Sequence, residues 1–155
     1  MTLRIEIPGE PTAWARAGQN GRFKFTPRPQ AVAMDVVRMA ANRVMAGQNV
    51  LTGPLHVSAK FIYAWPASWS QTKRSKAGAH WKTSRPDGDN LLKLVADALN
   101  GLVWTDDAII ASATIQKQYG VKPFTLIEIE SLTPRPAGCG AQPEAATGLV
   151  VSGTI

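Results

Sequence analysis

Apolar and polar residues alternate in several short stretches of this chain, which is the pattern of β-strands with one buried face. The first strand is predicted at residues 3–7 and the second at residues 55–63. Two further strands are predicted near the end, at residues 109–118 and 124–131. Residues 119–123 contain Gly and Pro and are predicted to join these last two strands as a hairpin.

Two longer stretches repeat their apolar residues at the spacing of an amphipathic helix. The first is predicted at residues 30–47, where Gly47 suits the end of a helix. Its expected buried face consists of Val32, Val36, Val37, Met39, Ala40, Val44 and Met45. The second helix is predicted to begin with Asp89 or Asn90 as the capping residue and to end at Asn100.

These elements predict a small single α/β (α+β) domain with a mixed β-sheet of about four strands and two main helices. The domain is expected to cover residues 1–132, and the Pro- and Gly-rich residues 133–155 are expected to form a flexible C-terminal tail. Residues 13–26 are predicted to be a loop or a short hairpin. Residues 67–85 are predicted to be a long polar and basic loop, of a length that often carries function.

Composition narrows the class of protein further. The chain has 155 residues, of which 45% are hydrophobic, as expected for a soluble globular domain. Its net charge of +6 favours a polyanionic partner over an acidic small molecule. Cys139 is the single cysteine, which fits a reducing compartment, and neither a signal pattern nor an apolar run of membrane length is present. A cytoplasmic protein with no membrane partner is therefore expected.

Five of the 11 acidic residues are crowded into one stretch. They are Asp87, Asp89, Asp97, Asp106 and Asp107. The preceding residues 71–85 carry only basic charges, from Lys73, Arg74, Lys76, Lys82 and Arg85. A basic run leading into an acidic cluster is expected where a phosphate backbone lies beside a divalent metal. Gly88 is expected to leave room for metal, water and phosphate between the first two acids.

Hard oxygen ligands holding Mg²⁺ can activate water and neutralise the transition state of phosphodiester hydrolysis. Lys93 lies on the same helix face as Asp89 and can add positive charge at the phosphate. Each feature also has a structural interpretation. Asp89 can be only a helix cap, Lys93 and Asp97 a surface ion pair, and Asp106 and Asp107 a turn. The residues alone leave a metal site and a structural cluster equally open.

The order of these residues resembles the signature of the RusA family of Holliday junction endonucleases. The family pattern is D-x-D-N-L-x-K, then a D-A-L helix end, then a D-D pair before a strand. In this chain residues 86–93 read PDGDNLLK, residues 97–101 read DALNG and residues 104–110 read WTDDAII. The resemblance covers residues 86–110 in detail, and the remaining elements only in their order.

This resemblance implies a small α/β domain, a symmetric homodimer and Mg²⁺-dependent cutting of four-way DNA junctions, with Mn²⁺ as a possible substitute. By position, it implies that Asp87, Asp89 and Asp107 bind the metal, with Asp106 as a further candidate ligand, and that Lys93 is the functional lysine. It implies no particular cut sequence, because Pro86 stands where some members carry a basic residue.

The leading hypothesis is therefore an endonuclease that resolves four-way junctions in DNA recombination and repair. Its expected DNA-binding residues come from the two polar loops; they are Arg16, Arg22, Lys24, Lys73, Arg74, Lys76, Lys82 and Arg85. His80 in the second loop has no neighbour at zinc-ligand spacing and is expected at the surface or against phosphate. Two alternatives remain. A metal-dependent phosphohydrolase acting on a small phosphoester has no need of the basic loop, and a non-catalytic DNA-binding module leaves the clustered acids unexplained.

Overall fold

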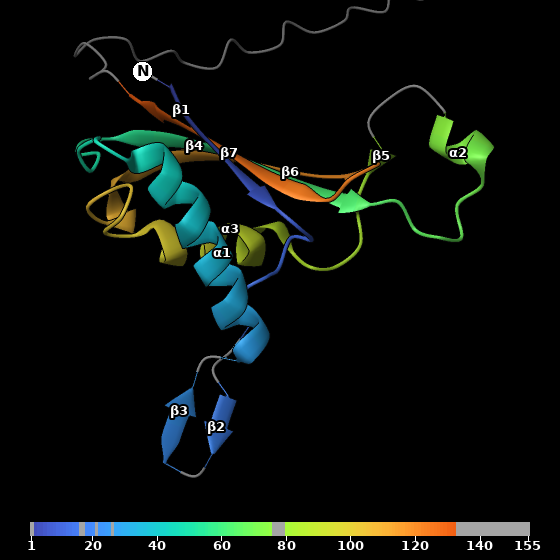
Figure 1. Ribbon diagram of the computed structural model, residues 1–155, viewed down its shortest axis with the longest axis horizontal. Coiled ribbons are helices and arrows are strands. Elements are labelled where there is room, and N and C mark those ends of the chain that lie inside the picture. The colour runs from blue at the N-terminus through green and yellow to red at the C-terminus, as the bar shows by residue number, and fades with distance from the viewer. Residues whose placement is uncertain (1, 16–17, 21, 26, 76–79, 133–155) are drawn as a thin grey trace, which may run out of the picture.

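The computed structural model describes residues 2–15, 18–20, 22–25, 27–75 and 80–132. Its main sheet has five strands, and two long helices pack on one face of that sheet (Figure 1). The strands are β1 (Thr2–Pro8), β4 (Leu55–Ala64), β5 (His80–Trp81), β6 (Ile110–Gly120) and β7 (Phe124–Ser131). The helices are α1 (Arg28–Met45), α2 (Gln71–Ser75) and α3 (Gly88–Leu99), with a 3₁₀ turn η1 (Asp107–Ile109). The α+β class is confirmed, with five sheet strands in place of about four.

The predicted strands and long helices form because their apolar residues face the sheet–helix interface. In β1, Leu3, Ile5 and Ile7 are buried, while the residues between them are exposed. A separate hairpin of β2 (Gly18–Asn20) and β3 (Phe23–Phe25) lies beyond the N-terminal end of α1 (Figure 1). The short hairpin that the sequence allowed at residues 13–26 is therefore present.

The strand order is β1-β7-β4-β6-β5, so β4 lies between β6 and β7. Ser58 of β4 pairs with Thr114 of the parallel strand β6 on one side and with Glu128 of the antiparallel strand β7 on the other. The predicted hairpin at residues 119–123 is wrong, because these residues connect two strands that are not neighbours. Alternation determines which face of a strand is buried, and it carries no information on which strand lies alongside.

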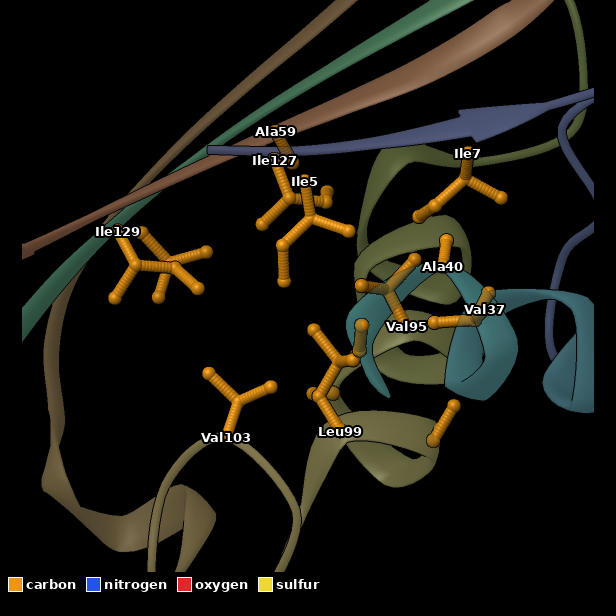
Figure 2. Packing of buried hydrophobic residues seen from close by; sticks show 14 of the residues in the cluster. Ile5, Ile7, Val37, Ala40, Ala59, Val95, Leu99, Val103, Ile127 and Ile129 are labelled. Carbon is orange, nitrogen blue, oxygen red and sulfur yellow. The ribbon is translucent and has the colours of Figure 1, made fainter. Parts of the chain in front are cut away.

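The core lies between the sheet and helices α1 and α3 (Figure 2). Ile5, Ala59 and Ile127 project from three neighbouring strands toward Val95 and Leu99 of α3. Several of the largest core side chains belong to α3 or to the segment just after it. These are Leu91, Leu94, Leu99, Val103 and Trp104, all with under 2% exposure or at that limit. Helix α3 is thus firmly supported, and its remaining face can carry polar chemistry.

Some expected features differ in the structure. Residues 67–85, predicted as one loop, contain α2 and β5. On α1, Val32 and Met39 were expected to be buried but are 55% and 59% exposed. Helix α1 packs mainly against α3 and β1, so only part of its apolar surface is covered.

Three of the predicted DNA-binding side chains cannot be placed. Arg16, Lys76 and the side chain of Lys24 lie outside the described residues, as does the predicted tail at residues 133–155. Among the helices that are described, none has the length and apolar character needed to cross a membrane.

Candidate active site

The acidic cluster begins where the chain enters α3. Asp87 occupies the N-cap position, and Asp89 lies in the first turn. The expectation that Asp89 or Asn90 caps the helix is wrong by two or three residues. The Asp87 carbonyl accepts a hydrogen bond from the Leu91 N–H at 3.2 Å, while its carboxylate makes no capping bond. Both carboxylates are exposed at the positive end of the helix dipole, where negative charge is stabilised.

Gly88 allows the start of α3 to lie directly on β6. A Cβ atom at this position would come within 2.9 Å of Cγ2 of Ile115. Such a contact is too short, and Ile115 is β-branched, so that its methyl group has little freedom to move away. The expected reason for this glycine was space for metal and phosphate; the structure gives close packing on the sheet as the reason. That packing fixes the backbone between the two acids.

Two lysine side chains hold the backbone just before the first acid. Lys117 on β6 donates from Nζ to the carbonyl oxygens of Ser84 and Pro86, at 3.0 and 2.7 Å. Lys82 donates from Nζ to the carbonyl oxygen of Arg85 and to the Ser84 hydroxyl oxygen, each at 2.6 Å. Three successive carbonyl groups therefore each accept a bond from an ammonium group. Lys82, which is also predicted to bind DNA, thus has two intramolecular partners in the structure.

Lys93 projects from the exposed face of α3. Its Nζ lies 4.4 Å from the centroid of the Trp14 ring, a cation–π contact. The backbone N–H of Trp14 donates to the backbone carbonyl oxygen of Asn90 at 2.8 Å. The backbone N–H of Ala15 donates to Oε1 of the buried Gln30 at 2.8 Å. The loop before the β2–β3 hairpin is thereby tied to both long helices, and it places an aromatic ring beside the functional lysine candidate.

The last two acids have different environments. Oδ1 of Asp107 accepts a hydrogen bond from Nε1 of Trp104 at 2.7 Å, and Trp104 is fully buried. Oδ1 of Asp106 accepts from the Ala108 N–H at 2.7 Å and so caps η1. Asp107 is therefore oriented by a rigid neighbour in the way that metal ligands commonly are, whereas Asp106 has a structural role at the turn.

Asp97 connects the helix to this second pair. Burial raises the pKa of Asp97 above its usual value, the positive charge of Lys93 lowers it, and the negative charge of Asp107 raises it. Asp97 lies in the last turn of α3, so this helix carries acidic residues near both of its ends, and Asp107 begins η1 a short distance further along the chain.

The chemistry of these side chains fits a hard divalent cation, which prefers carboxylate oxygens. Among the described residues, the single ion pair joins Arg38 and Asp35, so no Lys or Arg described here forms an ion pair with an acid of the cluster. Those same residues contain no group of three His, Cys, Asp or Glu side chains close enough to hold one ion. A Mg²⁺ ion commonly uses one or two carboxylates and completes its shell with water and phosphate, which matches acids that do not form a closed cage.

In the basic segment before the acids, one cation faces solvent and another is hydrogen-bonded to the backbone. Lys73 of α2 is exposed, with Nζ 4.1 Å from the centroid of the Trp69 ring. The Arg74 guanidinium donates to the carbonyl oxygens of Pro66 and Ala67, each at 3.2 Å. Arg74 therefore fastens α2 to the preceding turn, and Lys73 has its charge facing solvent.

An aromatic cluster lies under this segment. Trp69 packs edge-on against His80, with ring centroids 5.2 Å apart, and at a tilt against Tyr119 at 5.0 Å. His80 was expected at the surface, but its ring is packed here because β5 pairs with β6 beside Tyr119. The hydrogen bond of Tyr119 with Ser84 lowers the pKa of its phenol, which also lies near Lys82. The cluster joins the basic segment to the backbone that leads into α3.

Trp14, Trp104 and Lys117 contact the candidate site without having been expected from the sequence. For Lys117 a signal exists. It alternates with Ile115 and Tyr119 on the more apolar side of its predicted strand, and a lysine on such a side commonly has polar partners. No comparable signal identifies Trp14, because its contact with Lys93 joins parts of the chain far apart in sequence.

Comparison with known proteins gives two matches. The sequence model of the family described as endodeoxyribonuclease RusA matches residues 8–130. The chain is also 27% identical over 139 residues to a protein of Bacillus subtilis (strain 168) named "Uncharacterized protein YqaN", a match that spans 84% of this chain and 97% of that protein. The family match includes all five clustered acids and extends from the end of β1 almost to the end of β7.

Proposed function

Because this chain belongs to the RusA family of endodeoxyribonucleases, we propose that it resolves four-way (Holliday) DNA junctions with a divalent metal ion bound beside the start of α3. Enzymes of this family hydrolyse phosphodiester bonds in DNA and are generally dependent on a divalent metal. Membership in a family of enzymes therefore argues against a non-catalytic DNA-binding module. The biological process that fits this activity is DNA recombination and repair.

The observation that carries the proposal is the arrangement of acids on a rigid support. Asp87 and Asp89 are exposed at the start of a helix whose opposite face is buried in the core. Asp107 is oriented by the buried Trp104 at 2.7 Å. None of these three carboxylates has a basic partner within the part of the chain that the structure describes. Exposed carboxylates on a fixed backbone, left without a protein cation, favour an ion that is shared with the substrate.

In this proposal Asp87, Asp89 and Asp107 are the candidate ligands of Mg²⁺; one or two of them bind the ion directly, water and DNA phosphate complete its shell, and Mn²⁺ can take its place. Asp106 is less suited, because its oxygen already caps η1. When bound, the ion supplies Lewis-acid stabilisation of the phosphoryl group and an activated water. Lys93 supplies positive charge at the scissile phosphate, and the Trp14 ring holds the lysine side chain at the edge of the site.

DNA binding is assigned to the exposed cations around the acids. Arg22, Lys73 and Arg85 are exposed in the structure, and the net charge of the chain is +6. Lys82 and Arg74 contribute to the same surface mainly by holding its backbone. Positive charge on these segments offsets the repulsion of the acids toward the phosphates of a junction.

A symmetric homodimer completes the proposal, because a junction has two equivalent strands to cut and each chain has one acid cluster. Two surfaces favour self-association. The first is the outward side of α1 with Val32 and Met39, which are 55% and 59% exposed. The second is the edge of β6, where within the described residues β5 pairs only with Gln118 and Tyr119.

A panel of three substrates tests the proposal. The full-length protein is incubated with a synthetic four-way junction, a linear duplex of the same sequence, and a generic small phosphoester, each with and without Mg²⁺. The expected result is Mg²⁺-dependent cleavage of the junction alone. Hydrolysis of the small phosphoester in preference to DNA would instead support the phosphohydrolase alternative, and metal-independent cleavage would remove the role assigned to the acids.

A further inference from the structure

An open hollow lies directly beside the first acid, between the start of α3 and the loop that precedes the β2–β3 hairpin. Its volume is about 510 Å³, within the range of sites that hold small organic groups. The residues around it are Ala13, Trp14, Arg85, Pro86, Asp87 and Asn90. Its lining therefore includes Asp87, one of the proposed metal ligands.

The side chains around this hollow suit a planar, polar ring. An indole offers a flat face for stacking, a guanidinium can stack or donate two parallel hydrogen bonds, and an amide can donate and accept along the edge of a base. Trp14 and Asn90 are half-buried and Arg85 is exposed. A phosphate as the main occupant fits less well, because the Asp87 carboxylate and the indole ring take up part of the wall.

Both walls of the hollow are held in place by contacts that do not use the hollow itself. On one side, the backbone N–H of Trp14 donates to the backbone carbonyl oxygen of Asn90 at 2.8 Å, and Nζ of Lys93 lies 4.4 Å from the centroid of the Trp14 ring. On the other side, lysine ammonium groups bind the carbonyl oxygens of Arg85 and Pro86, at 2.6 and 2.7 Å. A hollow whose sides are already held in place loses less conformational freedom when an occupant binds.

We infer that the hollow receives a single unstacked nucleobase next to the scissile phosphate, stacked against Trp14, and that this contact selects where the strand is cut. The inference rests on the proposed function, because it places the base beside the metal-binding acids. Removing a base from a helix costs least where its stacking is already weakened, and in a junction with extended arms the crossover is such a position, because the arms do not stack on one another.

The test is a double-mutant cycle that combines protein variants with modified DNA junctions. Trp14→Leu removes the aromatic ring but keeps apolar bulk, and Trp14→Phe keeps a ring. Junctions carry one abasic residue in turn at each position around the cut. Binding is measured without metal, and cleavage sites are mapped with Mg²⁺. Trp81→Leu is the matched control, because Trp81 is 57% exposed and does not line the hollow.

Trp14→Leu is expected to weaken binding of the intact junction on the order of 5- to 150-fold, as expected for one lost base–aromatic stack. It is expected to have little effect on the junction that is abasic at one particular position, and to broaden the set of cut positions. Trp14→Phe should retain most of the affinity and selectivity. Thermal melting of each variant identifies any that fails to fold. If Trp14→Leu does not fold, the same comparison is made between Trp14→Phe and the wild-type protein.

Equal losses on intact and abasic junctions at every position would overturn the inference, because Trp14 would then act through Lys93 or through folding. Unchanged cut positions in Trp14→Leu would do the same. A wild-type protein that binds junctions but cuts none would contradict the proposed function instead. The binding cycle would still report on the hollow, so the two failures are distinguishable.

Discussion

At the scale of single residues, the carboxylates of the cluster differ in what already binds them. Asp106 caps a turn through one oxygen, and Asp107 is held by an indole N–H. Asp87 and Asp89 are exposed and make no hydrogen bond with their side chains to the residues described. These surroundings favour Asp87, Asp89 and Asp107 as ligands, and they assign Asp106 to the stability of η1.

The first prediction concerns these three acids. Asn at position 87, 89 or 107 keeps the size of the side chain but removes the charge that holds a divalent ion. Cleavage of a four-way junction is expected to fall on the order of a hundredfold or more, while junction binding persists or tightens, because less negative charge faces the phosphates. Asp35→Asn is the control, since Asp35 forms only an exposed ion pair with Arg38. Wild-type cleavage rates in Asp87→Asn protein would refute the assignment.

The second prediction concerns Lys117, whose ammonium binds the carbonyl oxygens of Ser84 and Pro86 at 3.0 and 2.7 Å. In Lys117→Met these carbonyl groups lose their donor, so the backbone leading to Asp87 is less fixed. We expect turnover to fall and the Mg²⁺ concentration for half-maximal cleavage to rise, with junction affinity nearly unchanged. Lys122→Met, an exposed control, should change neither.

A positioning role and a DNA contact give opposite results in that experiment. Lys117→Arg keeps a donor and is expected to restore part of the turnover. If Lys117→Met lost affinity for the junction and kept its Mg²⁺ requirement, Lys117 would be a phosphate contact, and the account of the backbone before α3 would be wrong.

At the scale of elements, the close contact between α3 and β6 connects the fold to the site. Gly88→Ala would bring a methyl group within 2.9 Å of Cγ2 of Ile115, so either the Ile115 side chain or the start of α3 must shift. We expect lower thermal stability together with a marked loss of cleavage, because Asp87 and Asp89 flank the displaced residue. Enzyme assays and melting curves on the same preparations provide the comparison.

The control for this change is Gly101→Ala. Gly101 has φ of +73° at the end of α3, so alanine is strained there although no atom lies within 4 Å of the new Cβ. Its expected cost is about 1 kcal/mol of stability, with cleavage close to normal at temperatures where the protein stays folded. Equal losses of activity in both variants would show that Gly88 matters for stability alone.

Most of the regular secondary structure was predictable from the sequence. Period-two and helical patterns identified four of the five sheet strands and both long helices, because each buries one regular face. Helix α2 and strand β5, with 5 and 2 residues, are too short to produce a period. The predicted β6–β7 hairpin failed because β4 pairs between them, and such long-range pairing leaves no local mark in the sequence.

The candidate site shows a similar division. Asp87, Asp89, Lys93 and Asp107 were identifiable from their spacing and from a family resemblance, and the family match extends that resemblance over residues 8–130. The surroundings of these residues were not identifiable, because Trp14 and Lys117 reach the site only through tertiary packing. The candidate acids and the candidate lysine could thus be named from the sequence, whereas the residues that contact them in the fold could not.

At the scale of the whole molecule, one chain carries one acid cluster, and two strands of a junction must be cut. We predict a homodimer in solution, with a surface that includes the exposed α1 residues Val32 and Met39 or the open edge of β6. Light scattering measures this directly. Met39→Glu is expected to weaken the dimer if α1 forms the interface, and Ala113→Pro is expected to do so if β6 does. A monomer both free and bound to a junction would exclude the symmetric arrangement.

The most direct measurement of the central claim is a strand-resolved cleavage map of one four-way junction, with each of its four strands labelled in turn. The account predicts two nicks at symmetric positions on opposing strands, dependent on Mg²⁺ and abolished in Asp87→Asn protein. Cuts scattered along the duplex arms, or a single nick without its symmetric partner, would contradict junction resolution by this protein.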